Sequence, residues 1–162
     1  MKLLRRDGDT FDLQLGRQEK EVLLRVIQLY PLVPAAHHRL SRGTQIPDQE
    51  ENQKLLDDSL RAQRQANQKQ VAALLNEPGR FAAAGKGLRV TFTRGEMEWL
   101  LQVFNDLRVG SWLALGSPDF SATTELPKGP DSLRHLAIMD MAGALEGLFL
   151  GAISGTTPAA PE

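Results

Sequence analysis

The sequence contains no cysteine among its 162 residues. This absence excludes disulfide bonds, thiolate zinc sites, iron–sulfur clusters and cysteine nucleophiles. The sequence also lacks an excess of charge of either sign, because 19 lysines and arginines stand against 20 aspartates and glutamates. Proteins that bind nucleic acids or anionic membranes usually carry a marked basic excess. We therefore expect neither a nucleic acid nor a membrane as the partner of this protein.

The N-terminal stretch Met1–Asp7 lacks the apolar core that a secretory signal needs, so the expected location is the cytoplasm. Hydrophobic residues make up 41% of the chain and charged residues 24%, which is typical of a globular protein. A chain of this length can bury a core without covalent or metal cross-links. We expect one mainly helical domain over residues 1–154 and a disordered tail over residues 155–162.

The hydrophobic pattern predicts a mainly α fold, with four helices and a small antiparallel sheet of two or three strands. Residues 11–15 alternate between apolar and polar side chains, as in a half-buried strand. The preceding pair Asp7-Gly8 favours a tight hairpin turn. The same alternation over residues 88–93 predicts a third strand. Residues 79–87 show no such alternation, and we expect a loose connector there.

Four stretches have the spacing of apolar residues that is typical of helices, and they cover residues 17–30, 48–76, 94–115 and 131–154. In the second, Arg61–Gln70 is almost entirely polar, which predicts an arm that is either solvated or covered by another chain. The third follows a capping box, Thr93-Arg94-Gly95-Glu96. Its apolar residues, Trp112 included, cover much of its circumference. This pattern predicts a central core helix.

The last helix is apolar enough over Leu136–Ile153 to raise the question of a transmembrane span. Asp140 and Glu146 interrupt the stretch and favour the buried helix of a soluble protein instead. One face carries a glycine at every fourth position: Gly143, Gly147 and Gly151. Because glycine weakens a helix, we expect close packing on this face. The packing is either on the third helix of the same chain, which we favour, or in the seam of a homodimer.

No residue pattern indicates catalysis, a metal site or a cofactor. His37 and His38 are neighbours that point in different directions, and His135 is distant in sequence. A zinc site needs three or four convergent ligands. The serines lie in no nucleophile-elbow context, and the glycines near residue 80 lack the spacing of a phosphate loop. We therefore expect a protein that is not an enzyme and that has no cofactor.

The most informative polar cluster is the Asn-Asp-Leu-Arg run at 105–108 in the third helix. Arg108 lies on the apolar stripe, so we predict that it is buried and paired with an anion. Asp106 is two residues away and faces elsewhere, whereas Asp140 interrupts the last helix in the same way and is the predicted partner. One interpretation is a structural ion pair between two helices. The other is a polar pocket around Asn105, Asp106, Arg108 and Asp140 that binds a carboxylate or phosphate.

With these residues the chain resembles an actinobacterial family of unknown function, whose genes commonly lie beside the Clp protease adaptor gene. The resemblance covers about residues 3–152 and rests on four stretches: Glu19–Leu29; Arg39-Leu40 with Pro47-Asp48, Leu56-Asp57-Asp58, Leu60 and Arg64; Trp99–Gly116; and Leu136–Leu150. The Asn-Asp-Leu-Arg run is its specific part. The chain has Ser111-Trp112-Leu113-Ala114 where the family usually has Leu-Gly-Thr-Arg, and its last helix lacks the family's tryptophan. The resemblance implies no activity, but the gene neighbourhood implies a link to regulated proteolysis.

Two functional hypotheses follow from the sequence. The first is a non-catalytic, cytoplasmic bacterial interaction or regulatory domain, with a link to regulated proteolysis. It would act through its polar arm on an unknown protein partner or on a second copy of itself. The second is a small-molecule or enzymatic site that binds an anion at Asn105, Asp106, Arg108 and Asp140. The positions of these four side chains discriminate between the hypotheses, since a pocket requires them to converge.

Overall fold

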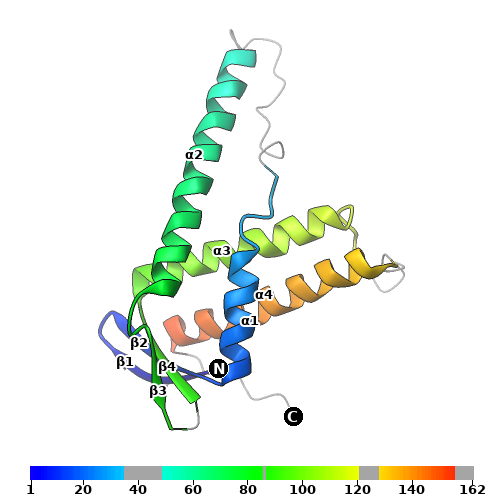
Figure 1. The fold of residues 1–162 in the computed structure, drawn as a ribbon. Coiled ribbons are helices and arrows are strands. Elements are labelled where there is room, and N and C mark those ends of the chain that lie inside the picture. Colours follow the sequence, from blue (N-terminus) through cyan, green and yellow to red (C-terminus); the bar gives the residue numbers. More distant parts are fainter. Residues whose placement is uncertain (35–48, 86, 121–127, 156–162) are drawn as a thin grey trace.

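The computed structural model describes residues 1–34, 49–85, 87–120 and 128–155. Its elements in chain order are β1 (Lys2–Asp7), β2 (Thr10–Leu15), α1 (Arg17–Gln28), α2 (Gln49–Asn76), β3 (Phe81–Ala84), β4 (Gly87–Thr93), α3 (Arg94–Ala114) and α4 (Pro130–Ser154) (Figure 1). The mainly helical prediction is confirmed within these ranges. The predictions for His37 and His38, for the start of the second helix at residue 48 and for the tail at 156–162 lie outside the described residues.

The sheet has four antiparallel strands in the order β1-β2-β4-β3, so the prediction of two or three strands is wrong. The additional strand is β3, in the segment predicted to be a loose connector. Its sequence, Phe-Ala-Ala-Ala, has no alternation that could reveal a strand. Hydrogen bonds to β4 hold it in extended conformation, and Gly85, with φ of 57°, lies in the turn between them.

One face of the sheet carries the core. Its buried side chains are Phe11, Leu13, Leu15, Val90 and Phe92. Phe11 is paired with Phe92 across β2 and β4. The Phe92 ring lies 5.7 Å from that of Phe149 in α4, and the Phe149 ring lies 5.3 Å from that of Phe104 in α3. The core therefore lies between one face of the sheet and the α3–α4 helix pair.

The helix α3 begins at the predicted capping box and is a core helix as predicted. Thr93 Oγ1 accepts the backbone N–H of Glu96, and the Glu96 carboxylate accepts that of Thr93, which confirms the capping box. The buried residues of α3 are Met97, Leu100, Val103, Phe104, Leu107, Gly110 and Ser111. The helix α4 packs along α3 and ends at Gly155, whose φ of 75° is the left-handed conformation expected of a glycine stop.

The helix α2 extends well beyond the other elements (Figure 1). It has 28 residues, yet Val71 and Leu74 are the buried ones among its described side chains, 50–76. Both lie near its C-terminal end, where it meets the body of the protein. The prediction that residues 61–70 form a polar helical arm is confirmed, since this part of α2 is helical and contains no buried residue.

An ion-pair cluster around Arg80 fixes the base of α2. The Arg80 side chain is 12% exposed and pairs with Glu77 at the end of α2 and with Glu96 at the start of α3. It also donates a 2.6 Å hydrogen bond to the Thr91 carbonyl of β4. Burial opposes ionisation of Glu96. The hydrogen bonds from Arg80 and from the Thr93 N–H, with the positive charge of Arg80, outweigh that effect and hold the pKa of Glu96 below its ordinary value of 4.5.

The lowered pKa of Glu96 gives a test of this cluster. A carboxyl group whose pKa is lower in the folded state stabilises the fold above pH 4.5 and loses this contribution as the pH falls through the folded-state pKa. We expect Glu96→Gln to lower the free energy of unfolding by about 1–2 kcal/mol at neutral pH, because glutamine can still accept the Thr93 N–H but loses the ion pair with Arg80. Urea denaturation should show this difference shrinking as the pH falls below 4.5.

The control is Glu98→Gln, since Glu98 is 55% exposed and pairs with Arg94 at 3.5 Å. We expect it to cost less than about 0.5 kcal/mol at either pH. A loss in Glu96→Gln that does not depend on pH would contradict the ionic role of Glu96.

Candidate functional site

Asp106, in the Asn-Asp-Leu-Arg run of α3, holds the chain that follows α1. Its Oδ1 atom accepts the backbone N–H groups of Leu32 and Val33, at 2.7 and 3.3 Å. These two N–H groups belong to an irregular segment and have no helix or sheet to satisfy them. A carboxylate that accepts backbone N–H groups in a partly buried place is a strong local constraint. The role that the structure gives to Asp106 is therefore to position the 30–33 segment.

Gly110, one turn after Asp106, allows the same segment to lie directly on α3. A Cβ atom at Gly110 would lie 2.4 Å from Leu32 Cβ and 2.6 Å from the Leu32 carbonyl carbon. Real Cβ atoms do not approach other atoms so closely. The glycine is therefore required by packing, not by an unusual backbone conformation.

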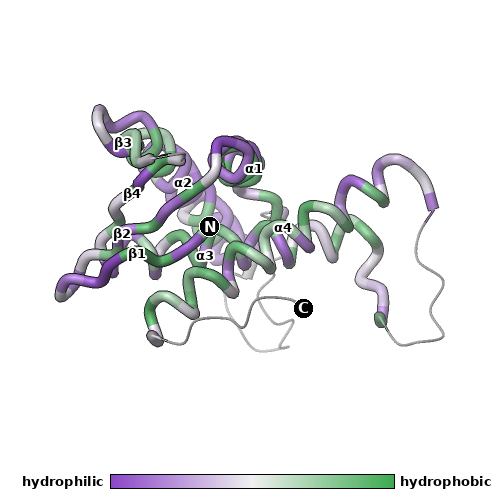
Figure 2. The backbone as a smooth tube through the Cα atoms, turned by 90° about the horizontal axis from the view of Figure 1, so that it is seen from below, coloured by the Kyte–Doolittle hydropathy of each residue, from purple (hydrophilic) through white to green (hydrophobic). Residues whose placement is uncertain are grey.

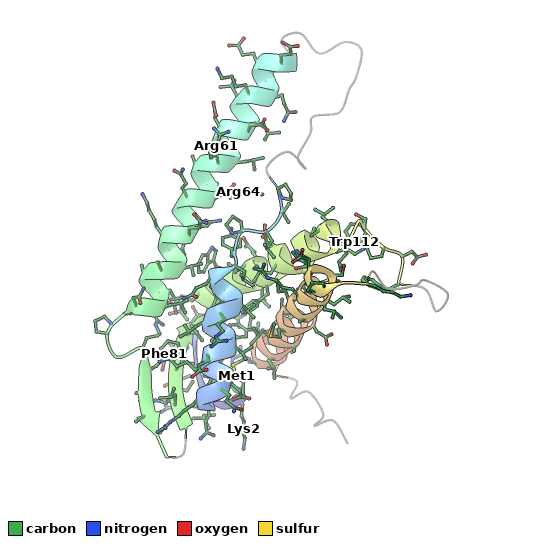
Figure 3. All side chains as sticks on the ribbon, turned by 45° about the vertical axis from the view of Figure 1, so that its right-hand side comes forward. Met1, Lys2, Arg61, Arg64, Phe81 and Trp112 are labelled. Atoms are coloured by element: carbon green, nitrogen blue, oxygen red, sulfur yellow. The ribbon has the colours of Figure 1, made fainter. Side chains whose placement is uncertain are left out.

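The helix α2 contacts the 30–33 segment from its other side. Arg64 donates a hydrogen bond to the Val33 carbonyl. Asn67 donates to the Tyr30 hydroxyl at 2.8 Å. The segment is thus held between α3 and α2, and Arg64 and Asp106 act on neighbouring backbone groups of it. Figure 3 shows the position of Arg64 along α2.

Arg108 does not occupy the buried position predicted for it. Its side chain is 46% exposed and pairs with Glu146 of α4, not with Asp140. The prediction failed because each four-residue step advances about 40° around an α-helix. From the fully buried Phe104, that step moves Arg108 to the edge of the stripe. A further step leaves Trp112, also predicted in the core, 36% exposed at the far end of α3 (Figure 3).

Arg108 and Asp140 nevertheless line one shallow, open hollow of about 480 Å³, together with Met139, Gly143 and Ala144. Asp106 lies elsewhere, at the 30–33 segment. The structure therefore brings together two of the four predicted site residues, Arg108 and Asp140. Asn105 is exposed and is not part of the lining of this hollow.

A second hollow, of about 320 Å³, lies between α1 and α2. Its lining residues are Leu24, Ile27, Gln28, Tyr30, Gln68, Val71, Ala72, Leu75 and Asn76. No sequence pattern indicates this hollow, because its two walls lie about forty residues apart in the chain and contain ordinary helix residues. The lining has apolar side chains and neutral amides but no charged group, so it does not provide an anion site.

Groups that could support metal binding or nucleophilic catalysis are not assembled in the described part of the chain. No cluster of three or more His, Asp or Glu residues able to hold a metal occurs there. His135 Nδ1 lies 3.4 Å from Ser111 Oγ, which is the arrangement closest to a nucleophile and base. Ser111 is fully buried within α3, and a buried hydroxyl cannot reach a substrate in solution.

The helix α4 is the one described helix that is long and apolar enough to cross a membrane, as judged by length and composition alone. It packs along α3 and contributes Phe149 to the core. The core helix of a soluble protein can have the same composition.

Gly110 and Gly147 provide a matched pair of mid-helix glycines. We expect Gly110→Ala to lower the free energy of unfolding by about 3 kcal/mol, because the new methyl group must displace Leu32. A Cβ at Gly147 would meet nothing within 4 Å. Gly147→Ala should therefore stabilise the protein by up to about 1 kcal/mol through helix propensity. Urea denaturation at low protein concentration measures both, and effects of the same sign would contradict this packing.

The exposed position of Arg108 predicts a modest contribution to stability. We expect Arg108→Leu to cost about 1 kcal/mol, well below the roughly 3–5 kcal/mol of a broken buried pair. A double-mutant cycle should show coupling of Arg108 with Glu146 and none with Asp140 at low protein concentration. A loss of several kcal/mol in the single variant would place the side chain in the core instead.

Comparisons with models of known protein families, with characterised proteins and with solved structures give no match for this chain.

Proposed function

We propose that this chain is a non-catalytic, cytoplasmic interaction or regulatory domain that binds a protein partner through the N-terminal part of α2. The observation that carries the proposal is the exposure of this helix. It extends beyond the body of the protein (Figure 1), and Leu55 near its free end is 63% exposed. Isolated polar helices are marginal in water, so a partner that covers the arm would stabilise it.

The outer face of the arm is apolar enough to bind such a partner. Leu55, Ala62 and Ala66 are all exposed and are spaced by seven and four residues, which places them on one side of the helix. Charged side chains such as Asp58 and Arg61 lie between them and pair with each other at 2.8 Å. A narrow apolar stripe with a charged rim is what a partner helix or groove recognises.

The base of the arm is fixed, so the arm has a defined direction relative to the body. Arg64 and Asn67 bind the 30–33 segment, and Arg80 connects the end of α2 to β4 and α3. A binding element held in this way loses less conformational entropy on association than a flexible one.

The alternative hypothesis, an anion-binding or enzymatic site around the Asn-Asp-Leu-Arg run, has weaker geometric support. Asp106 is engaged with backbone N–H groups, whereas Arg108 lies beside α4. The carboxylate of Glu146 already compensates the charge of Arg108. An anion in that hollow would also meet Asp140, whose charge would repel it.

Photo-cross-linking in the native cell tests the proposed role of the arm. A photoreactive amino acid placed at Ala62 should give a covalent adduct with one partner protein. The same amino acid at Ala83, exposed in β3, is the matched control and should not. Adding Leu55→Glu should abolish the adduct by placing a charge in the apolar stripe. Equal cross-linking from Ala62 and Ala83 would contradict a specific arm interface.

Mass spectrometry of the adduct also addresses the link to regulated proteolysis. The resemblance described above makes components of the Clp protease system the expected partners. Their presence in the arm-specific adduct would support an adaptor or regulator role in proteolysis. A partner outside that system would support the proposed interaction through the arm but contradict the link to proteolysis.

A further inference from the structure

The side of α4 opposite its buried residues is mostly exposed, and Arg108 of α3 lies against one edge of it, at Gly143. Its residues follow the alternating spacing of three and four that one helix presents to another, and they are Leu133, Leu136, Asp140, Gly143, Gly147 and Leu150. Leu133 is 65% exposed and Leu150 is 51% exposed. Figure 2 shows that most of α4 is apolar along its length. We call these six residues the outer face of α4.

The glycines of this face are not explained by packing within the chain. A Cβ at Gly147 would meet nothing within 4 Å, and a Cβ at Gly143 would make only ordinary contacts with Arg108, at 3.8 and 3.9 Å. The favoured interpretation from the sequence, close packing of this face on α3, is therefore wrong for Gly147, whereas Gly143 lies against Arg108 of α3 without the close approach that would require a glycine. Glycines between leucines leave depressions and projections on this face, which is exposed at Leu133, Gly147 and Leu150.

Charge adds a second, independent feature. Asp140 is the one charged residue of the outer face, and it has no ion pair among the described residues. Next to it, Arg108 of α3 lies against Gly143; it pairs with Glu146 in the same chain, and almost half of its side chain remains exposed to a second anion. The face thus carries an anion and a cation at adjacent positions, which is the condition for a surface to complement a copy of itself.

We propose that a second copy of this chain packs its α4 antiparallel against the outer face of α4. The two-fold axis crosses the outer face between Asp140 and Gly143. This interface is separate from the arm of α2 and does not depend on the function proposed for it. The resulting homodimer places two α3–α4 pairs back to back.

This register makes the two copies complementary in size and in charge. Leu133 faces Leu150 of the second copy, and Leu136 faces Gly147 of the second copy. Each leucine therefore packs either on another leucine or in the depression at a glycine. Asp140 faces Gly143 of the second copy, beside which that copy's Arg108 lies. Symmetry forms the Asp140–Arg108 ion pair twice. A lipid bilayer fits less well, because Asp140 would then enter the hydrocarbon.

Charge reversal tests the pairing between copies. The wild-type chain should dimerise with a dissociation constant in the micromolar range, measured by sedimentation velocity, because a single helix face is small for an interface. Asp140→Arg and Arg108→Glu should each weaken the dimer by about tenfold or more, since both place like charges together. An equimolar mixture of the two variants should regain wild-type affinity as a heterodimer. In that heterodimer both pairs again carry opposite charges.

One further test variant and three control variants separate this interface from effects on folding. Asp131→Arg and Arg134→Glu change exposed charges of α4 outside the outer face and should leave the dimer unchanged. Gly147→Glu should give a folded monomer by circular dichroism, because its side chain has open space in one copy but meets Leu136 of the other. Gly95→Glu is the matched change at an open glycine of α3 and should still dimerise.

A wild-type chain that stays monomeric at high micromolar concentration would overturn the proposal. A mixture of Asp140→Arg and Arg108→Glu that does not form the heterodimer would also overturn it, since only a pairing between copies predicts recovery. Binding of the wild-type monomer to neutral phosphatidylcholine vesicles, lost in Gly147→Glu, would assign the face to a membrane instead and equally contradict the dimer.

Discussion

Two backbone N–H groups, those of Leu32 and Val33, share one carboxylate oxygen of Asp106, and this interaction attaches the chain after α1 to α3. It fixes the end of α1 on α3, at a distance that only a glycine at 110 allows. The same segment then presents the Val33 carbonyl to Arg64 of α2. Asp106 thus adds to two other attachments, the buried α1 residues Leu23, Val26 and Ile27 and the ion pair of Arg80 with Glu96 at the start of α3.

This role also gives a physical meaning to the most specific part of the sequence. In the Asn-Asp-Leu-Arg run, Asp106 and Arg108 act on different neighbours, because two residues correspond to more than half a turn of helix. Asp106 faces the 30–33 segment and Arg108 faces Glu146 of α4. A motif that resembles a binding site in sequence thus serves two separate helix contacts. Polar residues required for architecture and for ligand binding are indistinguishable until their partners are known.

The rigid core and the free surfaces of this protein lie on the same helices. The helix α4 supplies Phe149 to the core and leaves most of its opposite side, including Leu133 and Leu150, exposed. The helix α2 is buried only near its base, at Val71 and Leu74. Exposed apolar side chains on elements that are firmly held are typical of surfaces that other proteins cover. A partner on either surface would leave the core unchanged.

The sequence by itself determined the helices, the N-terminal hairpin, the capping box at Thr93 and the polar arm, because these depend on periodicity and on residues within a few positions of each other. The apolar spacing along α3 also showed that Phe104 lies in the core. Tertiary structure alone decided the strand β3, since Phe81–Ala84 becomes extended only by pairing with β4. It alone decided that Arg108 pairs with Glu146, because small rotations along α3 determine which α4 residue it meets. The spacing of apolar residues shows which side of a helix is apolar. It does not show which residue of another helix is contacted by a side chain at the edge of that side.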